Sequence, residues 1–268
     1  MLHLLKIDLK KLTSYRTFWV ICGLYFFLLA VVLSSGNEFV KWLISKGAAI
    51  FDKSFSINRI PLYYFPDIWQ NILFVAGLFK MILGIMVVIS ITNEFAYRTI
   101  RQNIIDGMSR WEFLQSKILT NVLLSSMSVV MVFLIGLVTG MIYSPQLYIG
   151  DILNGMEFFL AYFIEVLTYL SFALLLGILV NRAGLAIVLL LFSRTIEFFI
   201  KVNVPDSVSW LSDLFPLESM TNLVPFPFLR YALQEIQDYV SLSSVLIALV
   251  WAFLFNYFAY VRLKKSDI

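Results

Sequence analysis

The sequence predicts an all-α membrane protein, with six transmembrane helices in one domain over residues 1–268, on three observations. First, 60% of the 268 residues are hydrophobic and only 14% are charged, whereas about 25% charged residues are usual in a soluble domain. Second, several apolar runs reach the length of about 20 residues that crosses a bilayer as a helix. Third, the charges between these runs are sorted by sign. An ordinary soluble fold is therefore excluded.

Six apolar runs are long enough to span the bilayer. They cover residues 17–33, 68–91, 118–141, 158–180, 184–199 and 242–261. Basic residues are retained on the cytoplasmic side during insertion. The segments on one side, which include both ends of the chain, hold twelve basic and five acidic residues, and those on the other side hold six basic and ten acidic residues. We therefore expect both termini in the cytoplasm.

Residues 1–14 are expected to form an interfacial amphipathic helix on the inner leaflet. Leucines recur there at helical spacing and lysines lie off that stripe: Leu2, Leu5, Leu9 and Leu12, with Lys6, Lys10 and Lys11. The chain would turn into the membrane between Thr13 and Thr17. The alternative is a basic flank that only fixes topology. A signal peptide is rejected, because the following apolar run is too long and no A-x-A cleavage site follows it.

The connection over residues 92–117 is too long for a tight turn and is cytoplasmic by its charge. Glu94 to Ile105 is predicted to be a short helix, and Asp106-Gly107 offers a left-handed stop. Ser109 and Glu112 form a capping box that starts the next helix, which runs on into the third span. This pattern predicts a helix, a break and a helix at the inner surface, suited to docking on another protein. A solvated loop whose charges only set topology is the alternative.

The stretch from Glu94 to Lys117 resembles the segment between the second and third spans of type-2 ABC exporter permeases. In that family an acidic residue precedes a Thr and an Arg, then a small turn, a Ser-Arg pair and a Lys. The matching positions are Glu94, Thr99, Arg101, Gly107, Ser109, Arg110 and Lys117. The residue before the Thr is often Gly in the family and is Arg98 here. With the six spans and the N-terminal helix, the resemblance covers nearly the whole chain.

The resemblance implies the membrane subunit of an exporter that a separate cytoplasmic ABC ATPase drives. A cytoplasmic coupling helix within residues 94–106 would dock on the ATPase through Glu94, Arg98, Thr99, Arg101, Gln102, Ile105 and Asp106. Two permease copies, as a homodimer or close paralogues, would assemble with two ATPases in a bacterial cytoplasmic (inner) membrane. The sequence contains no Gly-Lys-Ser or Gly-Lys-Thr, so ATP and Mg are expected on the partner and no cofactor on this chain. No nucleic-acid partner is expected.

Four charged residues fall inside the spans: Lys80, Glu165, Arg194 and Glu197. Each costs about 2 to 3 kcal/mol at the helix centre, so they should face protein or water and form pairs. Arg194 and Glu197 are three residues apart and can pair along one face, which leaves Lys80 and Glu165 as a cross-helix pair. These residues either line the transport path or only fix the packing. Gly136-x-x-x-Gly140 in the third span allows close helix approach.

Two outer segments are too apolar to be bare linkers. The first, residues 34–67, is rich in aromatic residues and should fold against the membrane surface or a partner: Trp42, Phe51, Phe55, Tyr63, Tyr64 and Phe65, with Pro61 and Pro66. The second, residues 201–241, is punctuated by Pro205, Pro216, Pro225 and Pro227 into pieces too short to span. In the resembling family this place holds a re-entrant external segment before the last helix. A loosely packed external loop is the alternative.

Two other classes of function compete with ATP-driven export. An intramembrane enzyme lacks its residues: His3 is the only histidine and Cys22 the only cysteine, so neither enzyme activity nor a metal site is expected. An ion-coupled secondary transporter would use Lys80 and Glu165 as a proton relay, but no inverted repeat is evident. The first outer segment, with 34 residues, is longer than in surface polysaccharide exporters of the resembling family. This favours a peptide, drug, ion or lipid-like substrate.

Overall fold

The computed structural model describes residues 2–47, 62–227 and 239–266. These residues form helices and turns, and no strand occurs among them. Six helical segments are long and apolar enough to cross a membrane: Arg16–Gly36, Ile68–Ala96, Arg110–Tyr143, Ile149–Val180, Ala183–Val202 and Leu242–Lys265. They coincide with the six predicted runs. The prediction of an all-α protein with six candidate membrane-spanning helices is therefore confirmed.

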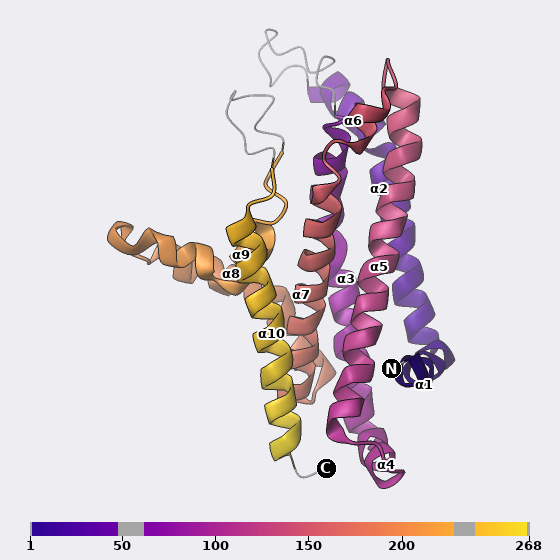
Figure 1. Ribbon diagram of the computed structural model, residues 1–268, viewed down its shortest axis with the longest axis vertical. Helices are drawn as coiled ribbons and strands as arrows, with labels where there is room; N and C mark the ends of the chain where they lie inside the picture. Colours follow the sequence, from indigo (N-terminus) through magenta and orange to yellow (C-terminus); the bar gives the residue numbers. More distant parts are fainter. Residues whose placement is uncertain (1, 48–61, 228–238, 267–268) are drawn as a thin grey trace.

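Five long helices run along the long axis of the bundle (Figure 1). They are α2 (Arg16–Gly47), α3 (Ile68–Ala96), α5 (Arg110–Tyr143), α7 (Glu157–Val180) and α10 (Leu242–Lys265). The helix α8 (Ala183–Val202) leaves this axis, and the chain around its end projects from one side. Because α3, α5, α8 and α10 all pack against α7, this helix lies at the centre of the bundle.

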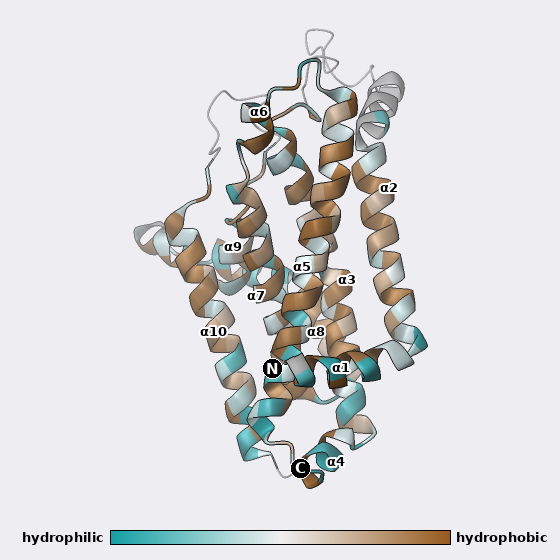
Figure 2. Cartoon of the chain, turned by 45° about the vertical axis from the view of Figure 1, so that its right-hand side comes forward, coloured by the Kyte–Doolittle hydropathy of each residue, from teal (hydrophilic) through white to brown (hydrophobic). Residues whose placement is uncertain are grey.

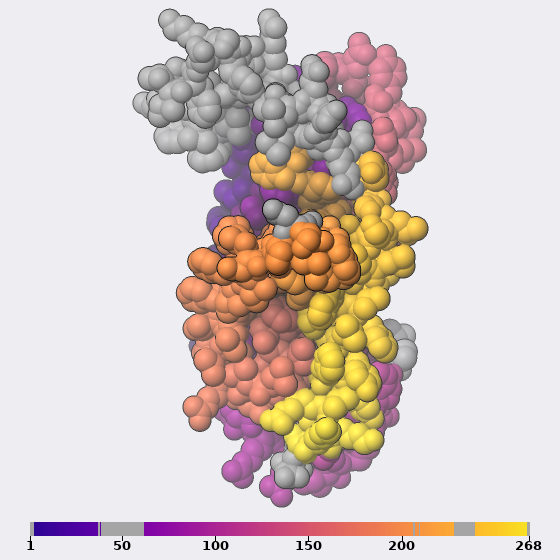
Figure 3. Space-filling view, turned by 90° about the vertical axis from the view of Figure 1, so that its left-hand side faces the viewer, coloured from indigo at the N-terminus to yellow at the C-terminus, as the bar shows by residue number. Residues whose placement is uncertain are grey.

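The outer surface is apolar along the middle of the bundle and more polar toward the end that holds α1 and α4 (Figure 2). Figure 3 shows a face of the molecule that α8 and α10 largely form. These two helices expose large apolar side chains, among them Phe192, Phe198, Phe253 and Tyr257. Water would disfavour so large an apolar face, whereas lipid chains cover it without that cost. The surface pattern is therefore that of an integral membrane protein.

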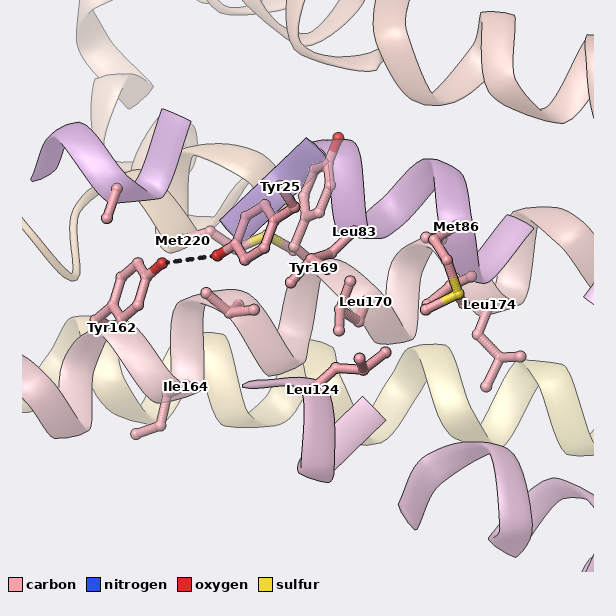
Figure 4. Packing of buried hydrophobic residues seen from close by; sticks show 14 of the residues in the cluster. Tyr25, Leu83, Met86, Leu124, Tyr162, Ile164, Tyr169, Leu170, Leu174 and Met220 are labelled. Atoms are coloured by element: carbon pink, nitrogen blue, oxygen red, sulfur yellow. Dashed lines mark hydrogen bonds between the residues drawn. The ribbon is translucent and has the colours of Figure 1, made fainter. Parts of the chain in front are cut away.

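Close helix contacts in the core depend on small residues between large ones. Figure 4 shows Leu83, Leu124 and Leu170 among the buried side chains that fill the core. A Cβ at Gly136 would overlap the side chain of Ile72, and a Cβ at Gly140 would overlap the ring of Phe65. The predicted close approach at the Gly136-x-x-x-Gly140 pair is therefore confirmed.

The first outer segment starts later than the sequence predicts. The helix α2 does not end at Leu33 but continues to Gly47, and Ser34 and Ser35 are accommodated in it because their hydroxyls donate hydrogen bonds to the carbonyls of Ala30 and Val31. Tyr63 and Phe65 pack on this protein's own helices: Tyr63 Oη donates to Leu33 O at 2.7 Å, and Phe65 lies 5.2 Å from Trp69 between ring centroids. Phe51, Phe55, Pro61 and the side chain of Trp42 lie outside the described residues.

The segment after α8 forms two short helices, η2 (Asp206–Leu214) and α9 (Pro216–Thr221). Leu217 and Met220 of α9 are buried, because α9 packs against α7, α8 and α10. Trp210 and Leu214 of η2 remain exposed. A further short helix, α6 (Ile149–Leu153), precedes α7. The part of the second outer segment over residues 228–238 lies outside the described residues.

Candidate functional site

A buried ionic cluster joins three helices at the end of the bundle that also holds both ends of the described chain. The helix α1 (Leu2–Ser14) lies across the bundle and packs against α5 (Figure 2). The ammonium of Lys117 on α5 contacts the carboxylates of Asp8 on α1 and Glu94 on α3. Thr120 Oγ1 also donates to Asp8 Oδ2 at 2.6 Å. We call Asp8, Lys11, Glu94, Lys117 and Thr120 the junction cluster.

The charges of the junction cluster balance, which explains why they tolerate burial. Asp8, Glu94 and Lys117 are exposed by only 3%, 7% and 4%. Lys11 Nζ lies 3.9 Å from Glu94 Oε2, so two carboxylates meet two ammonium groups. Buried ion pairs are tolerated when each charge has a partner and the remaining donors and acceptors of the charged groups are hydrogen-bonded. The cluster therefore holds α1, α3 and α5 in one fixed arrangement.

The short helix α4 (Thr99–Ile105) is attached to this cluster. Thr99 Oγ1 donates to Glu94 O at 3.3 Å, Ile100 is buried, and Lys11 Nζ donates to Asn103 Oδ1 at 3.0 Å. Three contacts on one side thus anchor a helix too short to be stable alone.

The helix predicted to start at Glu94 starts instead at Thr99, and this corrects the prediction. The helix α3 continues through Glu94 to Ala96, and Arg98 takes a left-handed conformation with φ of 56° that breaks it. Arg98 therefore occupies the backbone conformation that glycine adopts most easily. Gly107, with φ of 99°, ends α4, and the predicted capping box of Ser109 and Glu112 starts α5. These two predictions are confirmed.

The docking residues expected from the resemblance divide into two groups. Arg98, Arg101, Gln102, Ile105 and Asp106 are exposed, and Ile105 is exposed by 75%. We call these five residues the α4 surface. Glu94 is buried and Thr99 is half-buried, so both act as anchors of α4 rather than as part of its outer face.

The predicted cross-helix pair of Lys80 and Glu165 is confirmed. Lys80 on α3 contacts the carboxylate of Glu165 on α7 directly, and its ammonium lies 5.5 Å from the ring centroid of Tyr169. Gly77 leaves room for this pair, because a Cβ there would come within 3.0 Å of Glu165 Oε1. The pair lines a cavity of about 280 Å³ whose other walls are mostly apolar.

The predicted pairing of Arg194 with Glu197 is corrected in part. Arg194 Nη1 lies 2.9 Å from Glu218 Oε2 but 3.9 Å from Glu197 Oε1. Glu197 instead accepts hydrogen bonds from the backbone N–H groups of Leu217 (2.9 Å) and Glu218 (2.5 Å) at the start of α9. The physical reason is that those N–H groups have no partner within α9 itself. Arg194 and Glu197 therefore fasten the segment after α8 to the bundle.

Two polar features escape the sequence interpretation. Tyr25, Ser128 and Tyr162 form a buried hydroxyl cluster, with Tyr25 Oη 2.5 Å from Ser128 Oγ. Tyr25 Oη also lies 3.3 Å from Tyr162 Oη, the contact that Figure 4 marks. The second feature is Asp8, whose position between Leu5 and Leu12 places a carboxylate on the apolar stripe of α1. A carboxylate on the face that packs against the bundle needs a buried counter-ion, so this position could have indicated the ion pair. Among the described residues no group of three His, Cys, Asp or Glu side chains is arranged to hold a metal ion.

Comparison with known proteins gives one family. A family model described as "Protein of unknown function (DUF2705)" matches residues 26–268. The match begins within α2, so α1 and Asp8 precede it. No curated protein matches the chain.

Proposed function

The chain belongs to the DUF2705 family, and we propose that it is the membrane-spanning permease subunit of an ATP-driven ABC exporter. The orientation proposed with it places the α4 end of the bundle in the cytoplasm. There α1 would lie on the inner leaflet as an amphipathic helix, and α4 would be the coupling helix. The observation that carries the proposal is the contrast between the two sides of α4.

The inner side of α4 is fixed, whereas its outer side has no partner among the described residues that would explain its composition. Ile100 and Asn103 hold the helix to the bundle, while Arg101, Gln102 and Ile105 are exposed. The exposed Ile105, which lies between Arg101 and Asp106, suits docking on a partner protein, because apolar contacts contribute affinity and charges fix the register of the interface. A coupling helix also needs a rigid anchor, because a force on the helix moves the membrane-spanning helices only if the helix is firmly attached to them.

The junction cluster and α3 offer a route from α4 to the membrane interior. The residues Glu94 and Lys80 share α3, about 21 Å apart along its axis at 1.5 Å per residue. A displacement of α4 would move Glu94, and through Lys117 and Asp8 it would move α5 and α1 with it. Lys80 and Glu165 would then rearrange at the other end of the route, in the cavity between α3 and α7. Export would follow as this cavity opens alternately to the two sides.

The segment after α8 fits the same proposal. The short helices η2 and α9 would be the re-entrant segment that type-2 exporter permeases have before the last helix, and the buried side of α9 supports this interpretation. A second copy of the permease would complete the path. The substrate class that we favour is a peptide, drug, ion or lipid-like molecule, with a surface polysaccharide as the alternative.

The proposal predicts an ABC ATPase gene beside that of the chain, and it is tested by co-expressing the two proteins. We expect the ATPase to copurify with the wild-type chain and to be lost from the double variant Arg101→Glu, Ile105→Asp, because both changes alter the α4 surface. The control is Arg182→Glu, which reverses an exposed charge at the same end but outside α4. Equal copurification of the double variant, at equal membrane levels, would overturn the proposal.

An ion-coupled secondary transporter remains the second candidate, and the Lys80–Glu165 pair is the observation that favours it. A proton arriving at Glu165 would release Lys80. Transport in inside-out vesicles distinguishes the two candidates. Loss of transport when ATP is withdrawn supports the exporter, whereas transport that persists without ATP and stops when the proton gradient is collapsed supports the secondary transporter.

A further inference from the structure

A second feature of the α4 end is a basic groove, which shares Arg98 and Arg101 with the α4 surface and Glu94 with the junction cluster but is also lined by residues of α7 and α10. It has a volume of about 590 Å³ and lies where α4, the end of α7 and the end of α10 meet. Its walls carry four basic side chains, Arg98, Arg101, Arg262 and Lys265, together with Asn181 and Ser266. We call it the basic groove.

The basic side chains of the groove are not neutralised by the part of the chain that the structure describes. No carboxylate in residues 2–47, 62–227 or 239–266 forms an ion pair with Arg98, Arg101, Arg262 or Lys265. Glu94 lines the groove as well, but its carboxylate already contacts Lys117 and Lys11. Four positive charges therefore share one concave surface, which favours an anion.

Specific contacts hold the walls of the groove in place. Arg110 donates to Leu263 O at 3.0 Å and also to Lys264 O, and the ring of Trp111 lies 5.3 Å from that of Tyr260, so α5 fixes the end of α10. Arg98 and Asn181 both have φ of 56°, and they are the non-glycine residues with positive φ in the described chain. Such conformations are retained where surrounding structure enforces them.

A buried donor in the groove also has no partner. Ser266 Oγ is inaccessible and makes no hydrogen bond among the described residues. Unpartnered buried hydroxyls are uncommon and call for an explanation such as an absent ligand. A hydroxyl, an amide and three guanidinium groups around one space form a donor set suited to phosphate oxygens, which arginine binds in a bidentate manner.

We propose that the basic groove binds the phosphate group of an anionic ligand. The phospholipid headgroup is the source that its location favours, because basic pockets between the ends of transmembrane helices bind anionic headgroups. Leu179 and Leu185, which flank the turn that holds Asn181, are exposed and would contact the acyl chains. A soluble phosphate compound has the same chemistry and is the other source.

The test uses the purified full-length chain without any ATPase, so that its failure is separate from failure of the proposed exporter function. Native mass spectrometry measures the binding of phosphatidylglycerol and phosphatidylcholine, and thermal shift measures the binding of glycerol 3-phosphate and inorganic phosphate. The groove variant is Arg262→Gln with Lys265→Gln, which leaves α4 intact. The matched control is Arg182→Gln with Lys264→Gln, which removes two exposed charges at the same end but outside the groove.

We expect phosphatidylglycerol to bind the wild-type chain more tightly than phosphatidylcholine, whose choline cation the groove repels. The groove variant should weaken this binding by about 25-fold, since each basic residue near an anionic headgroup contributes about fivefold. The control should change it less than about twofold. Binding of glycerol 3-phosphate or inorganic phosphate that is lost in the same variant would assign the groove to soluble phosphate.

Two results would overturn the proposal. One is equal weakening in the groove variant and the control, which would indicate unspecific attraction by the basic end of the chain. The other is the absence of phosphate binding by the wild-type chain from either source. If copurification with the ATPase is then lost in the groove variant, the groove receives an acidic protein segment instead.

Discussion

Replacing Lys117 by methionine isolates the contribution of the junction cluster to stability. The change keeps the length of the side chain but removes the ammonium that Asp8 and Glu94 share. Glu94 would keep Lys11, at 3.9 Å, and the hydroxyl of Thr99, at 3.4 Å, whereas Asp8 would keep the hydroxyl of Thr120. Two carboxylates exposed by 3% and 7% would then lack their direct counter-ion.

The expected loss of unfolding free energy is about 3 to 5 kcal/mol, the usual cost of leaving a buried charge without its partner. Asp8→Asn alone should cost less, about 1.5 to 3 kcal/mol, because Lys117 still has Glu94. In the Lys117→Met background the sign reverses. There Asp8→Asn removes the stranded charge and should restore at least about 1 kcal/mol.

The assay is equilibrium unfolding in mixed micelles, followed by far-UV circular dichroism and by the fluorescence of the six tryptophans. Lys6→Met is the control, since Lys6 is exposed on the same helix as Asp8 and should change stability by less than about 0.5 kcal/mol. Destabilisation by Asp8→Asn in both backgrounds would refute the reasoning, because the carboxylate would then not depend on Lys117.

Three further predictions follow from backbone and packing geometry. Gly136→Ala should destabilise the protein by about 1 to 3 kcal/mol, because the new Cβ overlaps Ile72 and lies 2.7 Å from the Trp69 ring. The control is Gly23→Ala, which should be neutral or slightly stabilising because nothing lies within 4 Å of the new Cβ. The same unfolding assay compares the two variants. Arg98→Gly should raise stability by about 1 kcal/mol, since glycine adopts positive φ without strain, and a lower thermal midpoint would contradict this. Burial raises the pKa of Tyr63 to about 12, so the neutral phenol is favoured in the folded state. Its contribution should be complete below pH about 10 and decline as the pH rises toward 12, and Tyr63→Phe should flatten that alkaline slope in unfolding measured between pH 9 and 12.

Features that depend on neighbouring residues or on the solvent could be predicted from the sequence. The six spans follow from long apolar runs with few or no charges, because a bilayer penalises charge along a helix. The start of α5 follows from Ser109 and Glu112, whose reciprocal hydrogen bonds form within one turn. Lys80 and Glu165 could be paired because few other charges lie in the spans.

Features that depend on contacts between distant segments could not be predicted in the same way. The break at Arg98 carries no glycine or proline signal, and it exists because Ile100 and Thr99 hold α4 against the bundle. Arg194 finds Glu218 rather than Glu197 because α9 folds back onto α8. Single hydroxyls such as those of Tyr25 and Ser128 are unremarkable in an apolar run until the helices meet.

The bond between Asp8 and Lys117 also sets an order of events during synthesis. The two residues are separated by 109 positions, and at about 5 to 20 residues per second a ribosome needs roughly 5 to 20 s to bridge them. During this interval α1 has left the ribosome but its carboxylate has no ammonium to join, so the helix waits in contact with water. Only when α5 has entered the membrane does α1 gain its final position. The helix α1 is thus made well before the residue that fastens it, and a chain that stops before Lys117 leaves α1 undocked.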